Sequence, residues 1–199
     1  MKIVVIGATG TIGSRIVKAL EGKYEVIKVG KSSGQYRMDI SNTHSILAAL
    51  EEINAFDHLI CAAGDVAFNS FTNMSAEEWQ VNLSSKLMGQ VNLTREALKY
   101  LSPRGSITLT SGVLSDHTIA TGTGASTVNG AVEHFVKAVS TELPNGIRIN
   151  VVSPSLLQES VDVYGDFFPG YQPVSGDLVA KAYIRSALGV ATGQVFKVH

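Results

Sequence analysis

The chain has 199 residues, 45% of them hydrophobic, which fits one compact domain over residues 1–199 and excludes disorder as its main state. Its 16 Lys and Arg residues nearly balance its 17 Asp and Glu residues, so the chain lacks the basic excess that nucleic-acid binding needs. A single cysteine, Cys61, excludes an internal disulfide, and no apolar run approaches the roughly 20 residues that span a bilayer, so we expect a cytoplasmic protein without a membrane segment.

Short apolar runs alternate along the chain with longer stretches at helical spacing, a pattern typical of buried parallel strands joined by crossover helices. The runs predict strands over residues 3–6, 24–29, 58–62, 106–110, 147–152 and 194–198. The longer stretches predict helices over residues 12–22, 43–53 (capped by Ser41 or Asn42), 75–100, 125–143 and 178–188. Residues 112–124 and 155–176 are predicted as loops, and the second has a length that usually serves a function. The sequence therefore predicts an α/β fold.

A glycine-rich turn follows the first predicted strand and precedes the first predicted helix. Its residues are Gly7, Thr9, Gly10, Thr11, Ile12 and Gly13, with the three glycines spaced by three. Glycines allow the close approach of a diphosphate, and the unpaired N–H groups and dipole of the helix attract it. We therefore predict that this turn binds the diphosphate of a dinucleotide.

The residues after the second strand predict which dinucleotide is bound. An NAD site usually has a carboxylate here for the ribose hydroxyls, whereas an NADP site has a cation and hydroxyls for the 2′-phosphate. This chain has Lys31 and Ser32 at that place, so NADP(H) is preferred over NAD(H); the alternative for Lys31 is an ordinary solvated loop lysine. Asp39 and Ile40 follow after a short loop and are predicted to contact the adenine; the alternative for Asp39 is to start the next helix.

Later segments complete a resemblance to the short-chain dehydrogenase/reductase family. In order and spacing, the segments that carry it are Gly7-x-x-Gly10-x-x-Gly13, Asp39-Ile40, Cys61-Ala62-Ala63-Gly64, Val81-Asn82-Leu83, residues 106–111 and residues 147–154. The resemblance covers nearly the whole chain and implies a Rossmann-type fold, with a doubly wound parallel sheet of about seven strands and helices on both faces. It also implies hydride transfer between NADP(H) and a small carbonyl or alcohol. The further cofactor contacts that it implies are Ala62, Ala63, Gly64, Asn129 and Pro154.

The resemblance extends to only part of the family's catalytic residues. It implies that Asn82 and Ser111 are catalytic, although Ser111 can equally be a strand-end hydroxyl that bonds the local backbone. The family's tyrosine, which is the general acid, and its lysine four residues later correspond here to Ala125 and Asn129. An alanine carries no proton, and an asparagine can bind a ribose but cannot lower a neighbour's pKa by charge.

A non-standard proton donor is therefore expected if the chain catalyses turnover. Tyr164 and Tyr171 in the second loop and His117 in the first are candidates, each with the alternative of an ordinary packing or surface role. The second hypothesis is a catalytically degenerate NADP(H)-binding sensor or interaction protein. No metal site is predicted, and a homodimer or homotetramer through residues 75–100 and 125–143 is expected from the resemblance.

Overall fold

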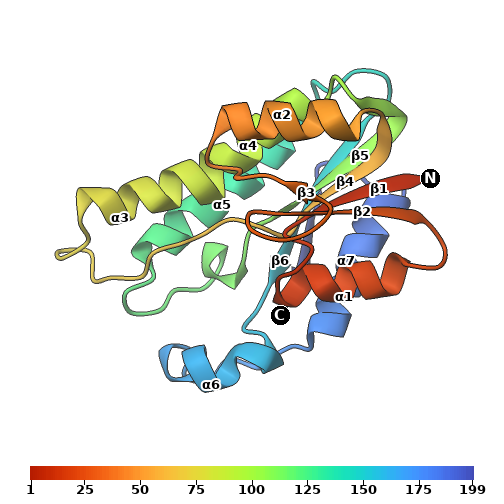
Figure 1. The fold of residues 1–199 in the computed structure, drawn as a ribbon. Helices are drawn as coiled ribbons and strands as arrows, with labels where there is room; N and C mark the ends of the chain where they lie inside the picture. The colour runs from red at the N-terminus through yellow and green to blue at the C-terminus, as the bar shows by residue number, and fades with distance from the viewer.

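The computed structural model describes residues 1–199 as a seven-stranded parallel sheet with helices on both faces (Figure 1). The strand order is β3-β2-β1-β4-β5-β6-β7, which confirms the predicted Rossmann-type α/β fold. The strands are β1 (Lys2–Ile6), β2 (Glu25–Gly30), β3 (Tyr36–Arg37), β4 (Phe56–Cys61), β5 (Leu101–Thr110), β6 (Arg148–Pro154) and β7 (Val195–Val198).

Two hydrophobic layers hold the helices against the sheet. Ile3 and Val5 of β1 pack toward α1 and α7, whereas Val4 and Ile6 pack on the other face toward α2, α4 and α5. Because both faces are covered, the strand is a continuous apolar run and not an alternating one. The helices are α1 (Thr11–Leu20), α2 (Thr43–Ile53), α3 (Ala76–Val81), α4 (Gln90–Ala97), α5 (Thr123–Val139), α6 (Val161–Tyr164) and α7 (Gly176–Leu188). None of these helices has the length and apolar character of a membrane span.

The predicted helix over residues 75–100 is present but is not uniform. Ser75 caps α3 in a reciprocal capping box with Glu78, as its sequence suggests. Between α3 and α4 the chain forms a π-helical segment, Asn82–Gly89, a local widening that often marks functional sites. Apolar periodicity does not reveal such a segment, because it assumes a constant 3.6 residues per turn.

Three other elements differ from the prediction. Strand β3 was missed because it has only two residues and no apolar run. Strand β5 begins at Leu101 and contains Pro103, which is tolerated because the pairing with β4 shifts at this point. The predicted loop 155–176 contains α6 and two short 3-10 helices, Gln158–Ser160 and Gly165–Phe167.

All seven strands run in the same direction, so their carboxyl ends meet at one edge of the sheet. Gly7 follows β1, Ala62 follows β4, Ser111 follows β5 and Ser155 follows β6. In sheets of this kind, ligands bind beyond this edge. The topology therefore brings four separate predicted segments to one place.

Candidate functional site

The glycine turn after β1 packs so closely that two of its glycines cannot be replaced without strain. Gly7 has a φ of 77°, and a Cβ there would lie 2.6 Å from the carbonyl oxygen of Ala62. A Cβ at Gly13 would lie 1.9 Å from the carbonyl oxygen of Gly7, so only glycine lets α1 approach the turn.

Gly10 differs from these two, because neither its backbone nor its packing requires glycine. Its φ is -77°, and a Cβ there would meet only the carbonyl oxygen of Gly7, at 3.4 Å. The missing side chain therefore leaves free space at the N-terminus of α1, where the N–H groups of the first turn have no partner within the helix. No acidic residue occupies that turn. Open space, free donors and the positive end of the helix dipole together fit a diphosphate.

A cleft of about 350 Å³ lies next to this turn, and we call it the nucleotide cleft. Most of the predicted cofactor residues line it, namely Gly7, Thr9, Lys31, Ser32, Asp39, Ile40, Ala62, Ala63 and Gly64. The turn residues Gly10, Thr11, Ile12 and Gly13 stand at the start of α1 beside it. Ile6, Gly30, Met38, Asp65 and Ser85 complete the lining.

The charge of Lys31 is partly neutralised in a way that the sequence did not indicate. The Lys31 ammonium lies 2.9 Å from the Asp39 carboxylate, and its side chain is 67% exposed. Hydrogen bonds from Ser41 and Lys31 lower the pKa of Asp39. The same carboxylate raises the pKa of Lys31, so both groups stay charged at neutral pH. Nearby, the hydroxyls of Thr9 and Ser33 lie 2.8 Å apart at the edge of the cleft.

A second cavity of about 160 Å³ lies beyond Gly64, and we call it the inner pocket. Its lining includes Ser111 after β5, Ala125 and Asn129 of α5, and Pro154 at the end of β6. No tyrosine lines it, and its single lysine is Lys86. The cavity therefore brings together Ser111, Asn129 and Pro154, and adds a cation that was not predicted.

Lys86 projects from the π-helical segment and is 7% exposed. A Cβ added to Gly64 would lie 2.9 Å from Cδ of Lys86, so the glycine gives the lysine stem its room. The ammonium forms no salt bridge or hydrogen bond within the chain. Burial lowers the pKa of Lys86 from 10.5 to about 8.

Ser111 is held by a buried carboxylate that the sequence analysis missed. Its hydroxyl donates to Oε1 of Glu133 at 2.7 Å, and the hydroxyl of Ser115 donates to the same oxygen at 2.6 Å. Glu133 is 6% exposed and lies one helical turn after Asn129 on α5. In this arrangement the Ser111 hydrogen is used within the protein, and its oxygen remains able to accept a hydrogen bond.

Asn82 does not line the inner pocket. It is fully buried, its Oδ1 accepts from the N–H of Ala67 at 2.9 Å, and its Nδ2 donates to the carbonyl oxygen of Glu78 at 3.1 Å. Its side chain therefore ties the segment after β4 to the helix. The catalytic role of Asn82 remains a prediction, and the side chain as folded is occupied by structural bonds.

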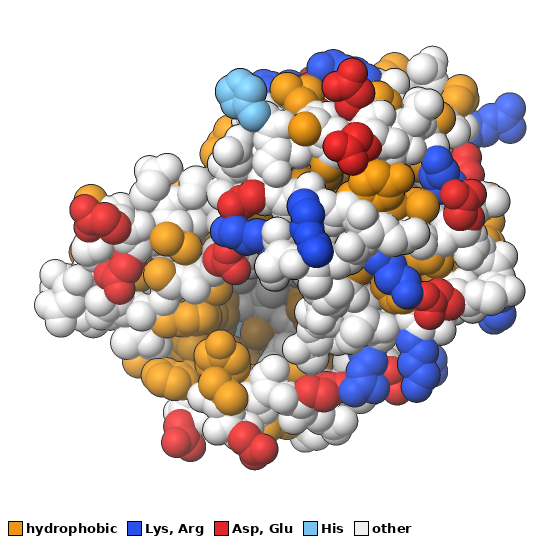
Figure 2. Space-filling model, in the orientation of Figure 1, with side chains coloured by type: hydrophobic (Ala, Val, Ile, Leu, Met, Phe, Trp, Pro, Cys, Tyr) orange, Lys and Arg blue, Asp and Glu red, His pale blue; other side chains and the backbone are white.

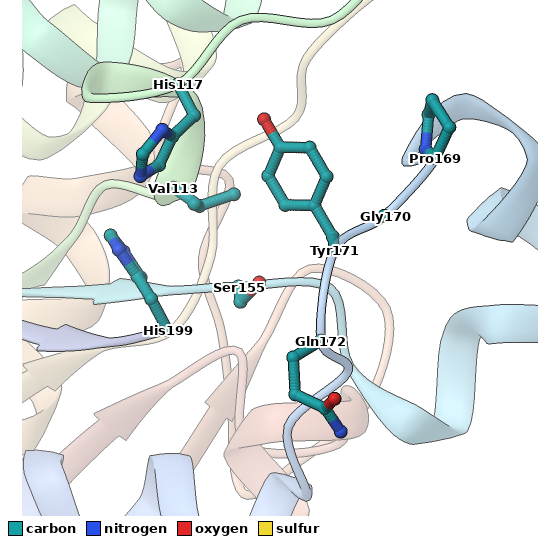
Figure 3. Close-up of a pocket in the computed structure, with 8 residues that line it drawn as sticks. All are labelled: Val113, His117, Ser155, Pro169, Gly170, Tyr171, Gln172 and His199. Atoms are coloured by element: carbon teal, nitrogen blue, oxygen red, sulfur yellow. The ribbon is translucent and has the colours of Figure 1, made fainter.

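A third cavity, the side pocket, gathers two of the candidate proton donors (Figure 3). His117 and Tyr171 lie across it from each other, with ring centroids 6.1 Å apart. The side pocket has a volume of about 290 Å³ and shares Val113 and Ser155 with the inner pocket. Tyr164 lies elsewhere, on the aromatic rim described next.

Aromatic side chains surround the approach to the inner pocket. Phe68 and Phe168 line the inner pocket and, with Tyr164 and Phe167, a small apolar recess beside it. Phe68, Tyr164 and Phe167 are 39%, 46% and 50% exposed, although large apolar side chains usually bury more of their surface. Figure 2 shows a hollow on this face of the molecule with hydrophobic side chains along its border. We call Phe68, Tyr164, Phe167 and Phe168 the aromatic rim.

The pKa of Lys86 leads to a test of its environment. A folded-state pKa of about 8 against 10.5 means that folding disfavours the ammonium. The cost is complete below pH 8 and disappears as the pH rises toward 10.5, where the unfolded chain also loses the proton. We expect Lys86→Met to raise the free energy of unfolding at pH 7 by about 1–3 kcal/mol, and to lose this advantage near pH 10.

Urea denaturation at both pH values measures the difference. Lys23→Met, which removes an exposed lysine before β2, is the matched control and should change stability little at either pH. A Lys86→Met variant that is less stable than the wild type at pH 7 would show that the ammonium has a stabilising partner.

Comparison with known proteins agrees with this geometry. Residues 11–185 match the family model described as enoyl-(acyl carrier protein) reductase. The crystal structure of the protein lin1944 from Listeria innocua has 42% identity and a TM-score of 0.98, with 100% of both chains covered. A small-chain dehydrogenase solved in complex with NADPH has 29% identity and a TM-score of 0.89, with 100% of this chain and 96% of that one covered.

A curated relative, the 3-oxoacyl-(acyl-carrier-protein) reductase of Aquifex aeolicus, is 25% identical over 163 residues. The match covers 78% of this chain and 64% of the length of that reductase. The family model spans residues 11–185, most of the chain, and the solved relatives share the fold of the whole chain. The chain therefore belongs to the short-chain dehydrogenase/reductase family.

Proposed function

We propose that this protein is an NADP(H)-dependent oxidoreductase that acts on a small carbonyl or alcohol with an apolar body. The observation that carries the proposal is the open glycine turn at the N-terminus of α1. The nucleotide cleft lies beside this turn, and the inner pocket lies at the same carboxyl edge of the sheet. The NADPH complex of a relative at 29% identity supports the same choice of nucleotide.

Each part of the site has a distinct task in this proposal. The N–H groups of Thr11, Ile12 and Gly13 hold the diphosphate, and the ammonium of Lys31 and the nearby hydroxyls attract the 2′-phosphate. When bound, the nicotinamide supplies the hydride, so the chain itself must orient the substrate and handle a proton. The free oxygen lone pairs of Ser111 accept a hydrogen bond from an alcohol, and the aromatic rim holds the apolar body.

The proton donor in this proposal is not a tyrosine of α5, because Ala125 occupies that part of the inner pocket. The titratable side chains that line the inner pocket and the side pocket are Lys86, His117, Tyr171 and His199, and Glu133 contacts Ser111 beside them. A site without a tyrosine of lowered pKa is expected to transfer the proton more slowly, since general acid–base catalysis contributes roughly 10²- to 10⁴-fold to the rate. We therefore expect a slow enzyme.

The second candidate is a sensor or interaction protein that binds NADP(H) without turnover. The observation that favours it is the hydrogen bonding of Ser111 and Asn82, whose donor groups are both used within the chain. Both candidates require nucleotide binding, so only consumption of the nucleotide separates them.

The preference for NADP(H) is tested at Lys31. We expect Lys31→Ala to weaken NADPH binding about 10-fold, because one charge-assisted contact to phosphate is lost, and to leave NADH binding unchanged. The dissociation constants follow from the fluorescence of the bound nicotinamide. The matched control is Lys23→Ala, an exposed lysine before β2, at the opposite end of that strand. Equal weakening of both nucleotides in Lys31→Ala would contradict the assignment.

Turnover is tested with a panel of carbonyl compounds. Apolar aldehydes such as hexanal and benzaldehyde are expected to be reduced with a kcat/KM at least about 10-fold above that of glyoxylate, because the rim buries their apolar surface. Phe168→Ala should lower this ratio, whereas Phe71→Ala, 69% exposed and outside the rim, should not. Tight NADPH binding with no consumption across the panel would favour the sensor.

We also propose that the protein is a homodimer or homotetramer through residues 75–100 and 125–143. Val81, Leu83 and Met88 of this helical region are 41%, 37% and 44% exposed, which is unusual for apolar residues on a helix without a partner. Light scattering should give two or four times the chain mass of 21.1 kDa. Met88→Asp should lower that mass, and Val163→Asp, another exposed apolar residue, should not.

A further inference from the structure

The inner pocket contains two polar side chains that have no partner in the chain. The ammonium of Lys86 has neither a salt bridge nor a hydrogen bond, and Oδ1 of Asn129 is buried without a donor. Lys86 is 7% exposed and Asn129 is 5% exposed; the Lys86 ammonium still reaches the pocket, whereas Oδ1 of Asn129 is shielded from water. An unpaired buried polar group costs free energy, and such groups are rare unless a ligand or an ion completes them. An amide oxygen without a donor and a nearly buried ammonium without a partner in the protein, both lining one pocket, point to a ligand.

The two residues line the same pocket, and their chemistry indicates which ligand group satisfies both. An ammonium only donates hydrogen bonds, whereas an amide oxygen only accepts them. A carboxylate or a carbonyl oxygen would satisfy Lys86 but leave Oδ1 of Asn129 without a donor. A hydroxyl does both, since its oxygen accepts from the ammonium while its hydrogen is donated to the amide oxygen.

The position of Lys86 indicates where that hydroxyl comes from. The lysine stem packs against Gly64, which lines the nucleotide cleft, while the ammonium belongs to the inner pocket. Lys86 therefore stands where the cleft continues into the pocket. A dinucleotide held at its diphosphate by α1 and at its adenine half by the cleft would extend its second sugar to this junction.

We propose that Lys86 and Asn129 together bind a hydroxyl of the sugar in the nicotinamide half of the dinucleotide. The cation comes from the helical segment between α3 and α4, and the amide comes from the neighbouring α5. This inference rests on the proposed nucleotide binding and adds a residue to it. Burial lowers the pKa of Lys86 to about 8, and a bound hydroxyl that accepts a hydrogen bond from the ammonium would offset part of the cost of burying its charge.

The test compares ligands that do and do not contain the second sugar, by calorimetry at pH 7 on the full chain. NADP⁺ and 2′-phospho-ADP-ribose contain it, and adenosine 2′,5′-bisphosphate lacks it. We expect Lys86→Met to weaken the first two about 10- to 100-fold and the third less than about twofold, as the loss of one charge-assisted hydrogen bond predicts. Lys23→Met, at an exposed lysine outside the pockets and the proposed subunit interface, is the matched control and should bind all three as the wild type does.

A second variant tests whether the two residues share one hydroxyl. Asn129→Leu should weaken NADP⁺ about 3- to 10-fold, since a neutral hydrogen bond is lost. The effects of Lys86→Met and Asn129→Leu should combine non-additively, because either change already breaks the shared arrangement. Fully additive effects would mean two independent contacts and would overturn the shared hydroxyl.

The outcomes separate this inference from the proposed function. A wild-type protein that binds none of the three ligands refutes nucleotide binding itself. A wild type that binds all three, with a Lys86→Met variant that weakens all of them equally or none of them, overturns the role of Lys86 alone. A loss seen with NADP⁺ but not with 2′-phospho-ADP-ribose also overturns it, because the contact would then be to the nicotinamide. If Lys86→Met melts below the wild type, Lys86→Gln is judged by the same criteria.

Discussion

The close packing of α1 against the turn after β1 is the contact on which the site depends. Gly13 lies so near the carbonyl of Gly7 that any side chain would force the helix away from the sheet. This contact fixes the direction of the free N–H groups at the start of α1. Because the sheet is parallel throughout, the same edge also receives Ala62, Ser111 and Ser155 from the other strands. One backbone contact thus aligns the proposed diphosphate site with a deeper pocket.

Beyond that turn, two polar side chains without partners lower the stability of the free protein, and packing alone does not explain them. Lys86 is buried without a partner in a π-helical segment, and Asn129 presents an amide oxygen that receives no hydrogen bond. Replacing either by an apolar residue would remove an unsatisfied group from the interior. A stability cost of this kind is common where a binding site is prepared in advance of its ligand. Stability of the free protein and affinity for its ligand therefore oppose each other at Lys86.

The sequence predicted the parts of this structure that follow from local chemistry. The glycine turn and the edge residues Ala62, Ser111 and Pro154 each follow a buried apolar run, so their meeting at one edge was predictable from parallel strands. The short strand β3 and the π-helical segment were not, because two residues carry no pattern and helical periodicity is blind to a local widening.

The charged residues were the least predictable part of the site. Lys86 was missed because the family resemblance places the lysine on α5, whereas the cation comes from the neighbouring helical segment. Glu133 was missed for a related reason, since its partners Ser111 and Ser115 lie 22 and 18 residues away. The ion pair between Lys31 and Asp39 joins two residues that had been assigned separate contacts. Such pairs depend on tertiary proximity, which spacing along one helix does not encode.

A crystal structure of the protein soaked with NADP⁺ tests the central claim most directly. The account predicts diphosphate oxygens within hydrogen-bond distance, about 3 Å, of the N–H groups at the start of α1, with the second sugar between Lys86 and Asn129. A fully soaked crystal with an empty cleft, or a nucleotide whose diphosphate lies away from α1, would contradict it.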